Sequence, residues 1–109
     1  MLTGTRIAFI GGGNMAEALL AGLLRKGVAV AEHLTVSDPD VHRRELLAER
    51  FGVAVHADNR TAAQGAELVV FCVEPQVLDS VLDEVASSLQ SRPLVMSVAA
   101  GYPISRLQA

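Results

Sequence analysis

Several residue types are scarce in this chain, and each shortage narrows what the protein can be. Tryptophan is absent, aromatic residues make up 4% of the sequence, and charged residues make up only 19%. Nine Lys and Arg against twelve Asp and Glu give a formal charge of -3, without the basic stripe that neutralises a nucleic-acid backbone. We therefore expect no nucleic-acid partner.

Cysteine and histidine offer little chemistry. Cys72 is the only cysteine, so it has no partner for an internal disulfide, and its apolar neighbours favour a buried, reduced thiol over a catalytic one. The three histidines, His33, His42 and His56, lack the spacing of a metal site. No nucleophile with a nearby base and no paired carboxylates stand out. We predict neither a catalytic residue nor a metal site within these 109 residues.

Long apolar runs are also missing. No stretch reaches the roughly 18 residues of a membrane span, and no signal-peptide pattern precedes the first apolar run. We expect a cytoplasmic protein without a membrane partner. Half of the residues are nonetheless apolar, with a mean hydropathy of +0.36, which suits one folded domain with a single core.

Short apolar runs alternate with helical patterns along the chain. The runs that predict strands are Arg6–Ile10, Leu34–Ser37, Val53–Val55, Leu68–Val73 and Leu94–Val98. The patterns that predict helices span Asn14–Lys26, residues 41–51, Arg60–Gln64 after an N-cap at Asn59, residues 77–89, and the start of a helix at Pro103–Ala109. Strands joined by helices pair in parallel through right-handed crossovers. We expect an α/β fold of the Rossmann type: a doubly wound, mostly parallel sheet in three αβα layers, forming one domain over residues 1–109.

A glycine cluster follows the first predicted strand and opens the first predicted helix. Gly11, Gly13 and Ala16 occupy the three small-residue positions of the GxGxxA dinucleotide motif. The first allows a sharp turn, the second lets the backbone approach a pyrophosphate, and the third allows close packing of helix on sheet. Three glycines in a row also occur in plain flexible turns. The acid Asp38, 22 residues after Ala16 at the end of the second strand, favours the dinucleotide interpretation.

The residues after the second strand leave the choice between NAD and NADP open. Asp38 is placed to hydrogen-bond the adenosine ribose, which favours NAD, because a carboxylate repels a 2′-phosphate. Its alternative role is a helix cap. Arg43 and Arg44 can hold the phosphate of NADP, although arginines on an exposed helix are usually just solvated.

Three segments resemble the pyrroline-5-carboxylate reductases. Ile7–Leu23 (IAFIGGGNMAEALLAGL) looks like the opening strand, Ile-Gly-x-Gly-Asn-Met-Ala turn and Ala/Leu helix of that family. Val70–Gln76 (VFCVEPQ) is similar to its strand ending in Val-Lys-Pro-Gln, and Ser97–Gly101 (SVAAG) matches its Ser-x-Ala-Ala-Gly. The resemblance covers essentially the whole chain.

The resemblance implies a cofactor groove across the carboxyl ends of the strands. The residues expected to wrap the pyrophosphate are Ile10, Gly11, Gly12, Gly13, Asn14 and Met15. Those expected beside the adenosine half are Asp38 and Asn59, and those expected to line the rest of the groove up to the nicotinamide are Cys72, Val73, Pro75, Val98, Ala99 and Ala100. Two departures stand out. Glu74 replaces the family's usual lysine, so either its side chain points away or affinity for the cofactor falls, and Gly12 is expected to loosen the turn.

The resemblance also implies an activity. Pyrroline-5-carboxylate reductases transfer a hydride from NADPH or NADH to 1-pyrroline-5-carboxylate and form L-proline. Their substrate pocket is built largely by a C-terminal helical domain that also makes the homodimer, so this chain is expected to be truncated and poorly active alone. Two alternatives stay open: the cofactor domain of a 3-hydroxyacid-dehydrogenase-like reductase, and a non-catalytic NAD(P)-sensing module.

Overall fold

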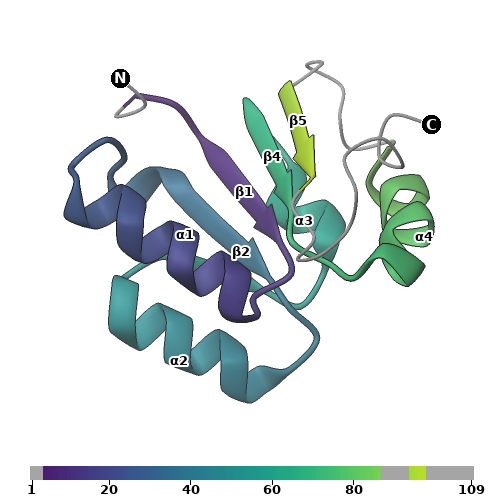
Figure 1. The fold of residues 1–109 in the computed structure, drawn as a ribbon, viewed down its shortest axis with the longest axis horizontal. Coiled ribbons are helices and arrows are strands. Elements are labelled where there is room, and N and C mark those ends of the chain that lie inside the picture. Colours follow the sequence, from purple (N-terminus) through teal and green to yellow (C-terminus); the bar gives the residue numbers. More distant parts are fainter. Residues whose placement is uncertain (1–3, 87–93, 98–109) are drawn as a thin grey trace.

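A parallel β-sheet forms the centre of the molecule (Figure 1). The computed structural model describes residues 4–86 and 94–97. The sheet has the strand order β3-β2-β1-β4-β5, with every neighbouring pair parallel. Its strands are β1 (Ile7–Ile10), β2 (Leu34–Ser37), β3 (Ala54–His56), β4 (Leu68–Phe71) and β5 (Leu94–Ser97). The chain starts in the middle and winds outward in both directions, which confirms the predicted doubly wound Rossmann-type fold.

Helices cover both faces of the sheet, α1 and α2 on one side and α3 and α4 on the other (Figure 1). They are α1 (Asn14–Arg25), α2 (Val41–Phe51), α3 (Asn59–Ala63) and α4 (Pro75–Val85), with a short 3-10 helix, η1, at Ala31–His33. None of the helices within residues 4–86 is long and apolar enough to cross a membrane.

The alternation of side chains along β1 divides the core in two. Ile7 and Phe9 pack with Leu20 of α1 and Leu47 of α2, whereas Ala8 and Ile10 pack on the side of α3 and α4. All four β1 side chains are buried, as expected for a central strand with helices on both faces. The three-layer arrangement therefore follows directly from the uniformly apolar strand.

Several predicted boundaries differ from the structure by one or two residues. Asn59 is not the N-cap of α3 but its first residue; the cap is Asp58, whose carboxylate accepts the backbone N–H of Arg60. Asp58 precedes the helix in an extended conformation, which directs its side chain back at the first free N–H groups. The third strand is shifted by one residue, because its ladder with β2 begins at Ala54 and ends at His56.

The fourth strand is two residues shorter than predicted. It ends at Phe71, although the N–H of Cys72 still donates to the carbonyl of Ile10 at 2.8 Å. The last predicted helix, at Pro103–Ala109, lies outside the described residues, as does the end of the amphipathic pattern at Leu89.

Leu47 gives a direct test of the packing between α2 and the sheet. We expect Leu47→Ala to lower the free energy of unfolding by about 3 kcal/mol, because the side chain is fully buried and leaves a cavity. Its neighbour Leu46 is 43% exposed, so Leu46→Ala should change the stability by less than about 0.5 kcal/mol. Urea denaturation of both variants measures the difference. Equal losses would contradict the placement of α2.

Candidate cofactor site

The turn between β1 and α1 starts with a residue that must be glycine. Gly11 has a φ of 102°, a conformation that other residues rarely adopt. A Cβ atom at this position would lie 2.7 Å from the carbonyl oxygen of Cys72. The turn therefore brings the backbone of β1 against the backbone that leaves β4, as the motif predicts for Gly11.

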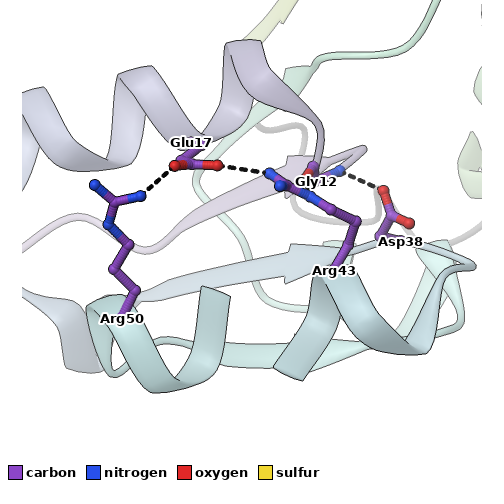
Figure 2. A network of polar contacts seen from close by, with 5 residues as sticks. All are labelled: Gly12, Glu17, Asp38, Arg43 and Arg50. Atoms are coloured by element: carbon purple, nitrogen blue, oxygen red, sulfur yellow. Dashed lines mark hydrogen bonds and ion pairs between the residues drawn. The ribbon is translucent and has the colours of Figure 1, made fainter. Parts of the chain in front are cut away.

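Side chains bond both backbone groups of Gly12, its N–H and its carbonyl. Its N–H donates to Oδ2 of Asp38 at 2.8 Å, and its carbonyl accepts Nε of Arg43 at 2.7 Å (Figure 2). Gly12 is buried, and a Cβ atom there would lie 2.9 Å from Cδ1 of Leu47. The expectation that Gly12 loosens the turn is wrong, because the surrounding side chains hold its backbone in place.

Gly13 faces open space at the start of α1. It is the N-cap of the helix, no side chain caps it, and a Cβ atom there would meet no other atom within 4 Å. The first turn of an α-helix also leaves N–H groups without partners inside the helix and carries the positive end of the dipole. Space beside Gly13 and free donors at this end suit a phosphate group.

The other residues of the turn divide between core and surface. Ile10 is fully buried, so only its backbone can reach a ligand, whereas Asn14 is exposed and Met15 half-buried. Ala16 is fully buried against the sheet. Its small side chain lets α1 pack closely, as the motif requires.

Asp38 lies at the carboxyl end of β2 and uses both carboxylate oxygens on backbone donors. Oδ2 accepts the N–H of Gly12, and Oδ1 accepts the N–H of Asp40, both at 2.8 Å. The N-cap of α2 is Asp40, whose side chain accepts the N–H of His42. Asp38 is therefore not the cap of this helix. It lies beside the glycine turn, where the dinucleotide motif expects an acid.

Two arginines of α2 turn toward the site rather than into solvent. Nη2 of Arg43 donates to Oε1 of Glu17 at 2.9 Å, and Nη1 of Arg44 donates to the carbonyl of Asp38 at 2.8 Å. Oε2 of the same glutamate accepts Nη1 of Arg50 at 2.5 Å (Figure 2). Sequence reasoning missed Glu17 and Arg50. The available signal was Glu17 itself, the one acid in an otherwise apolar or small stretch of α1.

Asn59 belongs to a second chain of hydrogen bonds at the same edge of the sheet. The buried hydroxyl of Ser37 donates to Oδ1 of Asn59, and Nδ2 of Asn59 donates to Oε1 of Glu84, both at 2.6 Å. These bonds join the end of β2 to α3 and α4. Asn59 thus lies near the carboxyl edge as expected, with its amide bonded to protein groups. Ser37 and Glu84 were not predicted.

The segment after β4 forms the opposite side of the turn. Cγ1 of Val73 would lie 3.1 Å from a Cβ atom built at Gly11, and Pro75 is the first residue of α4. Burial raises the pKa of the half-buried Cys72 thiol to about 11, so the thiol is protonated at neutral pH. This agrees with a reduced, unreactive cysteine.

Glu74 is exposed and occupies the N-cap position of α4 without capping it. Its Oε2 accepts Nε2 of Gln76 at 3.0 Å. A negative charge is favourable at this end of a helix, which accounts for an acid at this position. The remaining predicted groove residues, Val98, Ala99 and Ala100, lie outside the described part of the chain.

No group of three or more His, Cys, Asp or Glu residues in the described segments is arranged to hold a metal ion. What the structure brings together is a glycine turn, the open start of a helix and an acid, at the carboxyl ends of β1 and β2. That combination on a doubly wound sheet defines the class of Rossmann-type domains with a dinucleotide-type turn. The family described as "NADP oxidoreductase coenzyme F420-dependent" matches residues 6–101, and the chain belongs to this family.

Known relatives agree with this assignment. A pyrroline-5-carboxylate reductase from Pseudomonas aeruginosa is 40% identical over 104 residues, which are 95% of this chain and 38% of that enzyme. The structure of a pyrroline-5-carboxylate reductase from Coxiella burnetii matches with a TM-score of 0.84 and 31% identity, over 95% of this chain and 38% of that one. An imine reductase from Myxococcus stipitatus in complex with NADP+ matches with a TM-score of 0.73 and 27% identity, over 94% and 35% of the two chains. The chain thus spans about 38% of the length of the reductases it matches.

The raised pKa of Cys72 predicts a displaced pH profile for its alkylation. The rate of reaction with iodoacetamide in the folded protein should keep rising up to about pH 11, whereas in urea it should level off near the ordinary thiol value of 9.0. Because the folded state holds this proton more tightly, the free energy of unfolding should also fall as the pH rises from 9 to 11. Mass spectrometry of the alkylated protein follows the reaction. A midpoint near pH 9 in the folded protein would contradict this prediction, whatever the absolute rate.

Proposed function

We propose that this chain is the NAD(P)-binding domain of a pyrroline-5-carboxylate reductase, an enzyme that reduces 1-pyrroline-5-carboxylate to L-proline in proline biosynthesis. The observation that carries the proposal is the geometry of the glycine turn. Gly13 leaves open space beside the uncapped start of α1, and Gly11 and Gly12 fix the backbone around it. The 40% identity with the Pseudomonas aeruginosa reductase supports the particular activity.

A dinucleotide fits the residues in the following order. The first-turn N–H groups after Gly13 would hold the pyrophosphate, and Asp38 at the end of β2 would hold the adenosine ribose. The nicotinamide half would lie toward the segment that follows β4, where Cys72 and Val73 lie beside the turn. When bound, the reduced cofactor supplies a hydride. The described residues around the turn would bind and orient the cofactor through their backbone N–H groups and the carboxylate of Asp38.

The substrate side requires more protein than the matched region. More than half of the length of each matched reductase lies outside the similarity. We infer that a helical domain of the kind found in this family closes the substrate pocket and forms the homo-oligomer. We also infer that the enzyme works in the cytoplasm. The 40% sequence identity to a pyrroline-5-carboxylate reductase favours that activity over a 3-hydroxyacid-dehydrogenase-like enzyme. A non-catalytic sensing module is less favoured because the matched proteins are reductases.

Titration calorimetry with NADH and NADPH tests the cofactor site. The chain should bind at least one of them, and Gly13→Val should weaken that binding by about 100-fold or more, because the valine side chain fills the space left for the pyrophosphate. Gly22→Val, at the other end of α1 and equally free of contacts, is the matched control and should bind as the parent does. Binding that survives Gly13→Val would contradict the placement of the cofactor.

A chimera tests the activity. In it, this chain replaces the matched 38% of the Pseudomonas aeruginosa reductase. The chimera should oxidise NADH or NADPH when 1-pyrroline-5-carboxylate is added and should form proline. We expect kcat/KM to fall by no more than about 100-fold from the intact enzyme, the scale of loss when a cofactor is held slightly out of place. The chimera with Gly13→Val serves as the inactive control. A folded chimera that binds nucleotide yet forms no proline would contradict the proposed activity.

A further inference from the structure

Arg43 links the glycine turn to a carboxylate on the first helix. Its Nε donates to the carbonyl of Gly12 at 2.7 Å, and its Nη2 donates to Glu17 at 2.9 Å (Figure 2). The side chain is only 27% exposed. One guanidinium therefore bonds both the turn and α1, and its position depends on the acid that pairs with it.

Glu17 is well placed to control this guanidinium. Its backbone N–H donates to the carbonyl of Gly13 at 3.0 Å, which places it in the first turn of α1. Its side chain is 22% exposed and bonds Arg43 with one oxygen and Arg50 with the other. Two arginines thus hold a single carboxylate beside the proposed cofactor site. A charge pair of this kind, partly shielded from water, is stronger than one on an open surface.

We propose that Glu17 is a positioning residue that makes the site select NAD(H) over NADP(H) by keeping Arg43 on the Gly12 carbonyl. The inference rests on the proposed cofactor site. The two cofactors differ by a phosphate at the 2′ position of the adenosine ribose, which binds near the acid at the end of β2, here Asp38. That phosphate requires a cation. With Glu17 in place, Arg43 shares a carboxylate with Arg50, so its charge is partly compensated and its Nε and Nη2 donors are already bonded, while the carboxylate of Asp38 repels the phosphate.

Removal of the Glu17 charge should reverse this balance. Glu17→Gln keeps the shape of the side chain and can still accept a hydrogen bond, but it leaves both Arg43 and Arg50 without a carboxylate partner. We expect the wild type to bind NADH about tenfold or more tightly than NADPH, and Glu17→Gln to shift the ratio of the two dissociation constants about tenfold toward NADPH, the size of one charge-assisted hydrogen bond. Arg44 is unchanged in both proteins, but Arg50 loses the same carboxylate as Arg43, so only removal of Arg43 separates the two arginines.

The experiment is calorimetric titration of the wild type and the variants with NADH and NADPH at one fixed ionic strength. Glu49→Gln is the matched control, since it changes the formal charge equally, from -3 to -2, at an exposed position of α2. The ratio of the NADH and NADPH dissociation constants of Glu49→Gln should equal that of the wild type. Glu17→Asp retains the negative charge and should therefore keep most of the wild-type preference for NADH. Thermal unfolding confirms that each variant is folded.

A double-mutant cycle guards against an indirect effect of Glu17. In an Arg43→Gln background, Glu17→Gln should no longer change the ratio, because the guanidinium that it releases is absent. If Glu17→Gln alone proves unstable, Glu17→Ala takes its place in the cycle, because it also removes the carboxylate and should shift the ratio only when Arg43 is present.

Several outcomes would overturn the inference while leaving the cofactor site intact. These are a wild type that prefers NADPH, an equal weakening of both cofactors by Glu17→Gln, the same shift in Glu49→Gln, and a shift that persists without Arg43. Absence of binding of either cofactor to the wild type would instead overturn the proposed function, and this inference with it.

Discussion

The backbone of Gly12 is hydrogen-bonded on both sides by side chains from the second β-α unit, Asp38 at its N–H and Arg43 at its carbonyl. A glycine turn left to itself has more conformational freedom than any other segment, so a fixed turn needs such external bonds. Here they also set where α1 begins, because Gly13 follows directly as its N-cap. The phosphate-binding end of the helix is therefore located by residues that lie 25 or more positions further along the chain.

Packing against the core also holds the glycine turn in place. Leu47 of α2 and Val36 of β2 lie under Gly12, close enough that a Cβ atom there would have to displace them. The same leucine belongs to the core cluster that α1 shares with β1. On this face of the sheet, the core and the candidate site thus share a residue. The interior allows little movement because its side chains are closely packed, so the turn has little freedom to adopt another shape.

Most of the fold could be predicted from the sequence, because the relevant signals are local. The strands are uninterrupted apolar runs and the helices have a clear period, so their order and type were predictable, with boundaries off by one or two residues. The cap of α3 was wrong because Asp58 and Asn59 are both good cap residues, and only the backbone conformation decides between them. The glycine roles were predictable, but the bonds of Gly12 to distant side chains were not. Glu17, Arg43 and Arg50 are brought together by the packing of α1 against α2, which no local pattern encodes.

Glu17 is largely shielded from water, with 22% of its side chain exposed, and this bears on its role. A carboxylate on a mostly apolar helix loses part of its hydration, and ion pairs between partly buried groups often add less stability than a well-packed apolar side chain. An apolar residue at this position could pack against α2 without needing Arg43 or Arg50. The acid provides instead a fixed direction for Arg43, which an apolar side chain cannot do. On the role proposed for Glu17, the position of Arg43 beside the turn depends on this charge, which is the expected property of a residue whose main effect is on what binds beside it.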